Sequence, residues 1–221
     1  MTTAEERTAP VTIDIVSDVV CPWCFLGKRR LESALAAIPE IETVIRWRPF
    51  QLDPTVPPGG VERDAYIARR FGDRSRFEES ERRLAEMGAA EGADYRFDLI
   101  RRIPNTIDAN RLIRWGGEIG READIVERLF QLHFVEGADI GDHEVLAGAA
   151  AAVGMYRSAT LERLARDVDR AIVEAEIANA QRIGVTGVPT FILIGRYGLA
   201  GAQPAETLVD AIRRAAAEAP A

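Results

Sequence analysis

The sequence is poor in the side chains from which metal sites are built. It has only two cysteines and two histidines among 221 residues. A structural zinc site needs four such ligands at short, regular spacings. His133 and His143 instead lie more than a hundred residues beyond Cys21 and Cys24. We therefore expect no metal site and no metal cofactor.

Lysine and long apolar runs are scarce as well. Lys28 is the only lysine, and 28 basic residues face 35 acidic ones, for a net charge of −7. This acidic balance argues against a nucleic-acid partner. No stretch of about 18 apolar residues is present, so no membrane span and no membrane partner are predicted. Residues 1–10 lack the basic start and apolar core of a signal peptide and are predicted to be a disordered leader. Together these features predict a cytoplasmic protein, and they do not indicate its oligomeric state.

The two cysteines stand together in the motif Cys21-Pro22-Trp23-Cys24. A β-branched run over residues 11–17 predicts a strand before the motif, and the residues after it predict a helix. A C-x-x-C pair between a strand and a helix is typical of thioredoxin-like redox sites. A purely structural disulfide between residues three apart would close too short a loop to stabilise much. In a reducing cytosol, moreover, a disulfide is usually transient and catalytic.

The residue types within the motif assign different roles to the two sulfurs. Pro22 suits the first helical position, where a missing N–H costs nothing, and this places Cys21 at the N-cap. Free N–H groups and the positive end of the helix dipole then stabilise a thiolate, so Cys21 is the predicted nucleophile. Cys24 lies one turn further on, in line with the apolar stripe that begins at Leu31. The pattern predicts an exposed Cys21 that meets the partner and a buried Cys24 that resolves the mixed disulfide.

The rest of the chain alternates between sheet and helix in blocks. A second strand, at a sheet edge, is predicted over residues 43–50, followed by a Pro- and Gly-rich loop over residues 51–60. Helical patterns then continue to residue 183 with no strand pattern among them. A strand over residues 190–194, a hairpin partner over 196–200 and a helix from Pro204 complete the chain. We predict a discontinuous sheet domain over residues 11–60 and 184–221, and a helical insertion over residues 61–183.

A second motif, Gly187-Val188-Pro189-Thr190, precedes the third predicted strand. Proline cannot donate to a strand ladder, so it belongs at a strand's first position or at an edge. From these residues alone a trans proline is the default, because only about 5–6% of X–Pro bonds are cis.

Several stretches together resemble the DsbA family of thioredoxin-fold oxidoreductases. The resemblance is narrowest to its FrnE-like branch, which also resembles the 2-hydroxychromene-2-carboxylate isomerases. It spans about residues 11–217, and the stretches that carry it are residues 17–24, 27–31, 105–112, 187–191 and 201–204. The resemblance implies an α/β thioredoxin fold with a large all-helical insertion between the second and third strands.

The resemblance also implies a substrate-binding surface around the sulfurs. A cis Val188–Pro189 bond would pack beside them, and the Val188 backbone could pair with an extended substrate segment, as in strand addition. Trp23 would be partly exposed, as a flat apolar surface for a partner. Gln203, at the start of the last helix, is a further candidate near the sulfurs. With Pro22, these residues form the predicted substrate-binding set.

The leading prediction is a thiol–disulfide oxidoreductase or isomerase that needs no cofactor beyond the Cys21–Cys24 disulfide. Its partners would be thiol- or disulfide-bearing proteins or small molecules, with glutathione as one candidate co-substrate. One alternative keeps the fold but makes the protein a glutathione-dependent isomerase or transferase of a small hydrophobic substrate. Cys21 would then replace the serine typical of those enzymes. A third is a binding or chaperone module built around Trp23. The intact cysteine pair favours the first.

A few other side chains are weaker candidates. Lys28 could hold negative charge near the motif, but a solvated helix residue is the simpler interpretation. Asn105, Asn110 and Arg111 could line the site or serve as caps and surface groups. His133 is expected on a packed helix.

Overall fold

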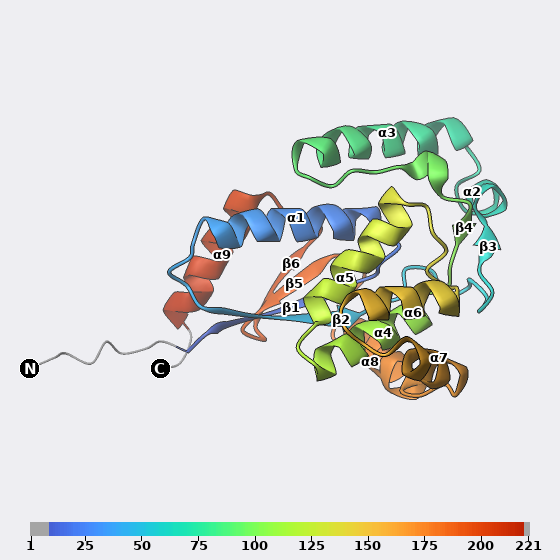
Figure 1. Cartoon of the computed structure of the whole chain (residues 1–221). Helices are drawn as coiled ribbons and strands as arrows, with labels where there is room; N and C mark the ends of the chain where they lie inside the picture. Colours follow the sequence, from blue (N-terminus) through green and yellow to red (C-terminus); the bar gives the residue numbers. More distant parts are fainter. Residues whose placement is uncertain (1–8, 219–221) are drawn as a thin grey trace, which may run out of the picture.

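A mixed four-stranded sheet carries the cysteine motif at the end of its first strand (Figure 1). The computed structural model describes residues 9–218, so most of the predicted leader and residues 219–221 lie outside the described part. The strands are β1 (Val11–Ser17), β2 (Thr43–Pro49), β5 (Thr190–Leu193) and β6 (Tyr197–Ala200). Their order is β2-β1-β5-β6, with β2 at an edge, as predicted. β1 and β2 are parallel, whereas β5 is antiparallel to β1 and to β6.

Side chains along β1 point alternately to the two faces of the sheet, and helices cover both faces. Ile13 and Ile15 point to one face and join the core that includes Phe25. Val16 points to the other face and packs with Ala180 and Val185. The first face is covered by α1 (Pro22–Ala36) and α9 (Ala205–Glu218), which pack against each other (Figure 1). The second is covered by α8 (Arg170–Arg182), which contacts β2.

The segment between β2 and β5 is mostly helical and packs on the sheet end that holds the motif (Figure 1). Its other helices are α2 (Arg63–Phe71), α3 (Arg74–Ala90), a 3₁₀ turn (Phe97–Leu99), α4 (Ile107–Glu118), α5 (Glu122–Phe130), a π turn (Gln131–Val135), α6 (His143–Ala152) and α7 (Arg157–Ala165). The predicted α/β class with a helical insertion is confirmed. The description "all-helical" is wrong in one detail: β3 (Val61–Glu62) pairs with β4 (Arg102–Ile103) inside the insertion. Two-residue strands are too short to show a period-2 pattern.

The insertion and the sheet share one hydrophobic core. Phe25 of α1 stacks on Phe130 of α5 with ring centroids 5.2 Å apart, and it meets the Tyr95 ring edge-on at 5.6 Å. Aromatic pairs in these geometries add stabilisation beyond the area they bury. The division at residues 60 and 183 therefore remains a prediction, although the helical block itself is evident. Among residues 9–218, no helix is long and apolar enough to cross a membrane.

Charged side chains also join α1 to the insertion. Lys28 is buried, and its Nζ lies 2.5 Å from Glu127 Oε2 on α5. The interpretation of Lys28 as a solvated residue is therefore wrong. Arg29 donates to both oxygens of the same carboxylate, and Arg30 binds Glu91 in the same way. Bidentate arginine–carboxylate pairs fix orientation, so the motif helix is held firmly against the insertion.

Candidate active site

Cys21 occupies the N-cap of α1, as the sequence predicts. Its backbone is extended, with φ −85° and ψ 113°, and Pro22 opens the helix. The Cys24 N–H donates to the Cys21 carbonyl at 3.0 Å, so the second cysteine lies one turn into the helix. Both residues are free thiols. The thiol of Cys21 therefore lies at the helix N-terminus, where unpaired N–H groups and the dipole favour negative charge.

The predicted exposure of Cys21 is wrong. Cys21 is 3% exposed, nearly as buried as Cys24. The loop before β5 covers it, and the Cys21 thiol donates to the Val188 carbonyl at an Sγ–O distance of 3.5 Å. Trp23, in contrast, is 41% exposed, as predicted for a partner-facing surface. Trp23 is therefore exposed to solvent, whereas both cysteines of the motif are buried.

The Val188–Pro189 bond is cis, as the family resemblance implies. A Cβ on Gly27 would lie 2.9 Å from Pro189 Cγ, so the proline ring packs directly on α1. The Pro189 carbonyl accepts from the Gly201 N–H at 2.8 Å, which anchors the loop to the turn before α9. Glycine at position 27 is what allows this loop to approach the motif helix so closely.

Gln203 belongs to that same turn. Its side-chain amide donates to the Ala200 carbonyl at 2.6 Å. The adjacent Ala202 lies near Gly27 and accepts a hydrogen bond from Arg30. The turn is therefore anchored to α1, while a substrate-binding role for Gln203 remains a prediction.

Tyr95 is a site residue that sequence reasoning missed. Its hydroxyl donates to the Pro22 carbonyl, between the two cysteines, at 2.6 Å. A Cβ on Gly88 would lie 2.4 Å from the Tyr95 ring, so this glycine makes room for it. Burial raises the pKa of Tyr95 well above its ordinary range, and negative charge on the cysteines acts in the same direction. The phenol therefore remains a hydrogen-bond donor, and Tyr95 serves as a positioning residue for the motif.

The surroundings of Cys24 favour its thiol form. Burial raises the pKa of Cys24 well above its ordinary value, and the neighbouring Cys21 acts in the same direction. The Ser17 hydroxyl and the Asp18 backbone act against this, but they are smaller effects. A protonated, buried sulfur suits a group that reacts second.

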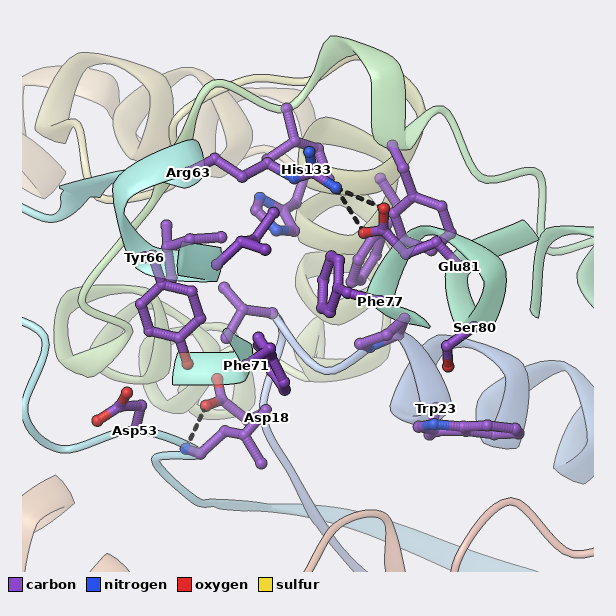
Figure 2. Close-up of a pocket in the computed structure, with 18 of the residues that line it drawn as sticks. Asp18, Trp23, Asp53, Arg63, Tyr66, Phe71, Phe77, Ser80, Glu81 and His133 are labelled. Carbon is purple, nitrogen blue, oxygen red and sulfur yellow. Dashed lines mark hydrogen bonds and ion pairs between the residues drawn. The ribbon is translucent and has the colours of Figure 1, made fainter. Parts of the chain in front are cut away.

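Asp18 is a second residue that the sequence did not single out, although it lies three positions before Cys21. It is 1% exposed, and Oδ2 accepts from the Leu52 N–H at 2.7 Å (Figure 2). The other oxygen, Oδ1, makes no well-aligned hydrogen bond, although the Thr106 hydroxyl faces this carboxyl and acts to lower its pKa. Burial raises the pKa of Asp18 from 3.8 to about 6, despite the hydrogen bond from Leu52.

This raised pKa predicts a pH-dependent stability. A carboxyl with a higher pKa in the folded state binds its proton more tightly there, so it contributes stability below about pH 4. That contribution is lost as pH rises through about 6. Two pKa units correspond to about 3 kcal/mol. Urea denaturation of the wild-type protein and of Asp18→Asn measures this contribution. The unfolding free energy of the wild type, relative to that of the variant, should fall by about 2 kcal/mol between pH 4.5 and 7.5. A pH-independent difference would contradict this assignment.

The remaining polar candidates from the sequence have structural roles. Asn105 and Asn110 donate to the backbone carbonyls of Val56 and Thr106. Arg111 is fully buried and donates to the Arg163 carbonyl on α7 and to Asp108. The Arg111 bonds hold α4 and α7 together, whereas Asn105 binds the loop at residues 51–60 and Asn110 binds the N-cap residue of its own helix. None of these bonds involves the sulfurs.

Comparison with known proteins identifies the family and the fold. The DSBA-like thioredoxin domain family matches residues 12–213. A probable DsbA oxidoreductase from Streptomyces coelicolor is 32% identical, with a TM-score of 0.87 over 96% of this chain and 92% of that chain. A 2-hydroxychromene-2-carboxylate isomerase shares the fold at 18% identity, with a TM-score of 0.69 over 92% and 95% of the two chains. The cytosolic disulfide reductase DsbM from Pseudomonas aeruginosa, in a structure with GSH, does so at 20% identity, with a TM-score of 0.62 over 94% and 96%. The chain belongs to the family of DSBA-like thioredoxin-domain proteins.

Proposed function

We propose that the protein is a cytoplasmic thiol–disulfide oxidoreductase or isomerase that acts through the Cys21–Cys24 dithiol. The observation that carries the proposal is the position of Cys21 at the N-cap of α1, with Cys24 one turn further on and both residues buried. The helix N-terminus stabilises a Cys21 thiolate, and the thiolate is the nucleophile in disulfide exchange.

The reaction balances without a further cofactor. The Cys21 thiolate attacks one sulfur of the substrate disulfide, and the other substrate sulfur leaves as a thiolate and takes up a proton. The Cys24 thiol then loses its proton and attacks Cys21 Sγ, which releases the second substrate thiol. The substrate has gained two electrons, and the protein holds a Cys21–Cys24 disulfide. Two glutathione molecules reduce that disulfide to the dithiol and become glutathione disulfide.

The loop before β5 and the exposed motif tryptophan supply a surface for the substrate. We propose that an extended segment pairs with the Val188 backbone, next to the Cys21 sulfur that this residue now covers. The exposed ring of Trp23 offers an apolar surface for the same segment. Pro22 and Pro189 are the other residues that we expect to contact it. The substrate is a disulfide- or thiol-bearing protein or small molecule.

A glutathione-dependent isomerase or transferase of a small hydrophobic substrate is the second candidate. It is favoured by one observation, a largely apolar cavity that begins at Pro22 and Trp23. Under this alternative Cys21 would act alone and Cys24 would be dispensable. The intact pair, with its second thiol buried one turn behind the first, supports the dithiol proposal instead.

An assay with glutathione distinguishes the two candidates. The wild-type protein is mixed with a disulfide-bonded peptide, glutathione, glutathione reductase and NADPH, and NADPH consumption is followed. We expect catalysed reduction of the peptide well above the rate with glutathione alone, and loss of that catalysis in Cys21→Ser. No catalysis with the peptide, together with glutathione conjugation of an electrophile, would overturn the proposal and favour the alternative.

A further inference from the structure

A cavity of about 470 Å³ opens beside the thiol motif (Figure 2). Its walls come from α2 and α3 of the insertion, the loop at residues 51–56, the segment before α4, and Pro22 with Trp23 of the motif. This volume lies within the range of small-molecule sites, about 300–1,000 Å³. Neither cysteine lines it, so the cavity borders the motif without containing the sulfurs.

The cavity is apolar at its rim and across its middle. Trp23, Leu52 and Phe71 all line it, and all three are among the large apolar side chains that the fold leaves exposed. The Phe71 ring lies 4.6 Å from that of Phe77, and both project into the cavity (Figure 2). Apolar side chains gathered around an opening mark a surface that binds something.

Buried polar atoms without partners line the same cavity. They are Asp18 Oδ1, Asp53 Oδ2, Thr106 Oγ1 and His133 Nδ1, each on a residue at least nine-tenths buried. A buried polar atom left unpaired costs about 1–3 kcal/mol, so native proteins keep few of them. The Thr106 hydroxyl faces the Asp18 carboxyl and the Tyr66 hydroxyl faces that of Asp53, and each lowers the pKa of its carboxyl. A carboxylate accepts more than one hydrogen bond, so both carboxylates keep acceptor capacity toward the cavity, which a ligand with donor groups would use.

The charged side chains that line the cavity indicate which kind of ligand it can bind. Arg63 is engaged by both oxygens of Glu81 at 2.6 Å, and Arg76 pairs with Asp73. Burial lowers the pKa of His133 to about 4, so its ring is neutral at pH 7. Asp18 and Asp53 thus carry the remaining negative charge of the cavity wall, and the nearby Arg70 offsets part of that of Asp53.

The acceptors lie together at one end of the cavity. Figure 2 shows Asp18, Asp53 and the Tyr66 hydroxyl gathered there. Burial, with the Asp53 charge second, raises the pKa of Tyr66 to about 12, so its hydroxyl keeps its proton. Exposed Arg70 lies near Asp53 but is not part of the wall. This end therefore suits a group that donates hydrogen bonds and carries no negative charge.

We propose that this cavity binds a small molecule with an aromatic or aliphatic body and an amine or other donor group, cationic or neutral. The body packs against the Phe71 and Phe77 rings, which contact each other, and the donor group reaches Asp53 and Asp18. An anionic peptide such as glutathione fits this wall poorly, because its carboxylates would meet carboxylates. Binding in this cavity requires neither a sulfur in the ligand nor a reaction at the cysteines. The cavity proposal can therefore be tested independently of the redox proposal.

Isothermal titration calorimetry of the full-length protein at pH 7.5 tests the charge preference. Three probes share one ring system: 2-(2-naphthyl)ethylamine, 2-(2-naphthyl)ethanol and 2-naphthylacetate. We expect the amine to bind most tightly, the alcohol next, and the carboxylate at least tenfold more weakly than the amine, since a charged hydrogen bond is worth more than tenfold in affinity. Equal or tighter binding of the carboxylate, or no heat with any probe, would overturn the proposal.

Two substitutions locate the binding. Asp53→Asn removes charge but keeps an oxygen for the Thr55 bonds that Asp53 now accepts. It should weaken the amine about tenfold and the alcohol by less than about threefold. Phe71→Ala, at an exposed rim position, should weaken both about fivefold. Asp98→Asn and Ile119→Ala, exposed residues outside the cavity, are the matched controls. If the test and control variants bind alike, the probes occupy another site and the proposal is wrong.

Discussion

Cys24→Ser is expected to accumulate as a covalent mixed disulfide with its substrate. The thiol of Cys21 at the N-cap of α1 can still attack, but no second sulfur one turn behind it can release the product. After incubation with a disulfide-bonded peptide, intact-mass spectrometry should show most of the protein carrying one peptide strand. Steady-state turnover should fall more than tenfold, with slow release by glutathione as the residual route.

Cys21→Ser supplies the matched control. A serine hydroxyl does not form a mixed disulfide, and Cys24 is buried beneath the motif, so this variant should carry no adduct. Adducts on Cys21→Ser would mean that Cys24 is the attacking sulfur. Full turnover in Cys24→Ser would mean that the second thiol is not used, as the isomerase or transferase alternative requires.

Gly27→Val is expected to damage stability and activity together. A Cβ at position 27 would lie 2.9 Å from Pro189 Cγ and 3.4 Å from the Phe191 ring, so the loop that covers Cys21 must shift. Overpacking of this kind costs about 1–3 kcal/mol. Because Val188 and Pro189 move away from Cys21, we also expect the second-order rate of disulfide exchange to fall about tenfold. Urea denaturation and stopped-flow exchange kinetics measure the two effects.

Gly148→Val is the control for this change. Gly148 lies within α6 on an exposed face, and a Cβ there would meet nothing within 4 Å. The same substitution should change the unfolding free energy by less than about 0.5 kcal/mol and leave the exchange rate unaltered. If Gly27→Val behaved like Gly148→Val, the close packing of Pro189 on α1 would not matter for the site.

Local patterns were enough to predict the sheet and the motif helix. The β-branched run before Cys21 and the proline after it predict β1, the N-cap and the start of α1, and the structure places all three there. The edge position of β2 follows from its polar face. These features depend on neighbours in sequence, which is the information that a single chain contains.

The features that depend on distant segments could not be predicted in this way. Cys21 is buried because Val188, 167 positions later, covers it. Tyr95 reaches the Pro22 carbonyl, 73 positions away, from the stretch after α3, which has no clear pattern. Lys28 is buried because Glu127 of another helix pairs with it. Each contact is set by tertiary packing, and no periodicity or motif in the sequence specifies it.

A redox titration of the wild-type protein in glutathione buffers, read by thiol alkylation and mass spectrometry, tests whether Cys21 and Cys24 react as a pair. We predict that Cys21 and Cys24 oxidise together as one two-electron couple, with the intramolecular disulfide as the oxidised species. The midpoint then gives the direction in which the protein transfers disulfides, since about 30 mV changes the equilibrium tenfold. A stable glutathione adduct on Cys21 with Cys24 still a free thiol, or no oxidation of either residue, would contradict the dithiol mechanism.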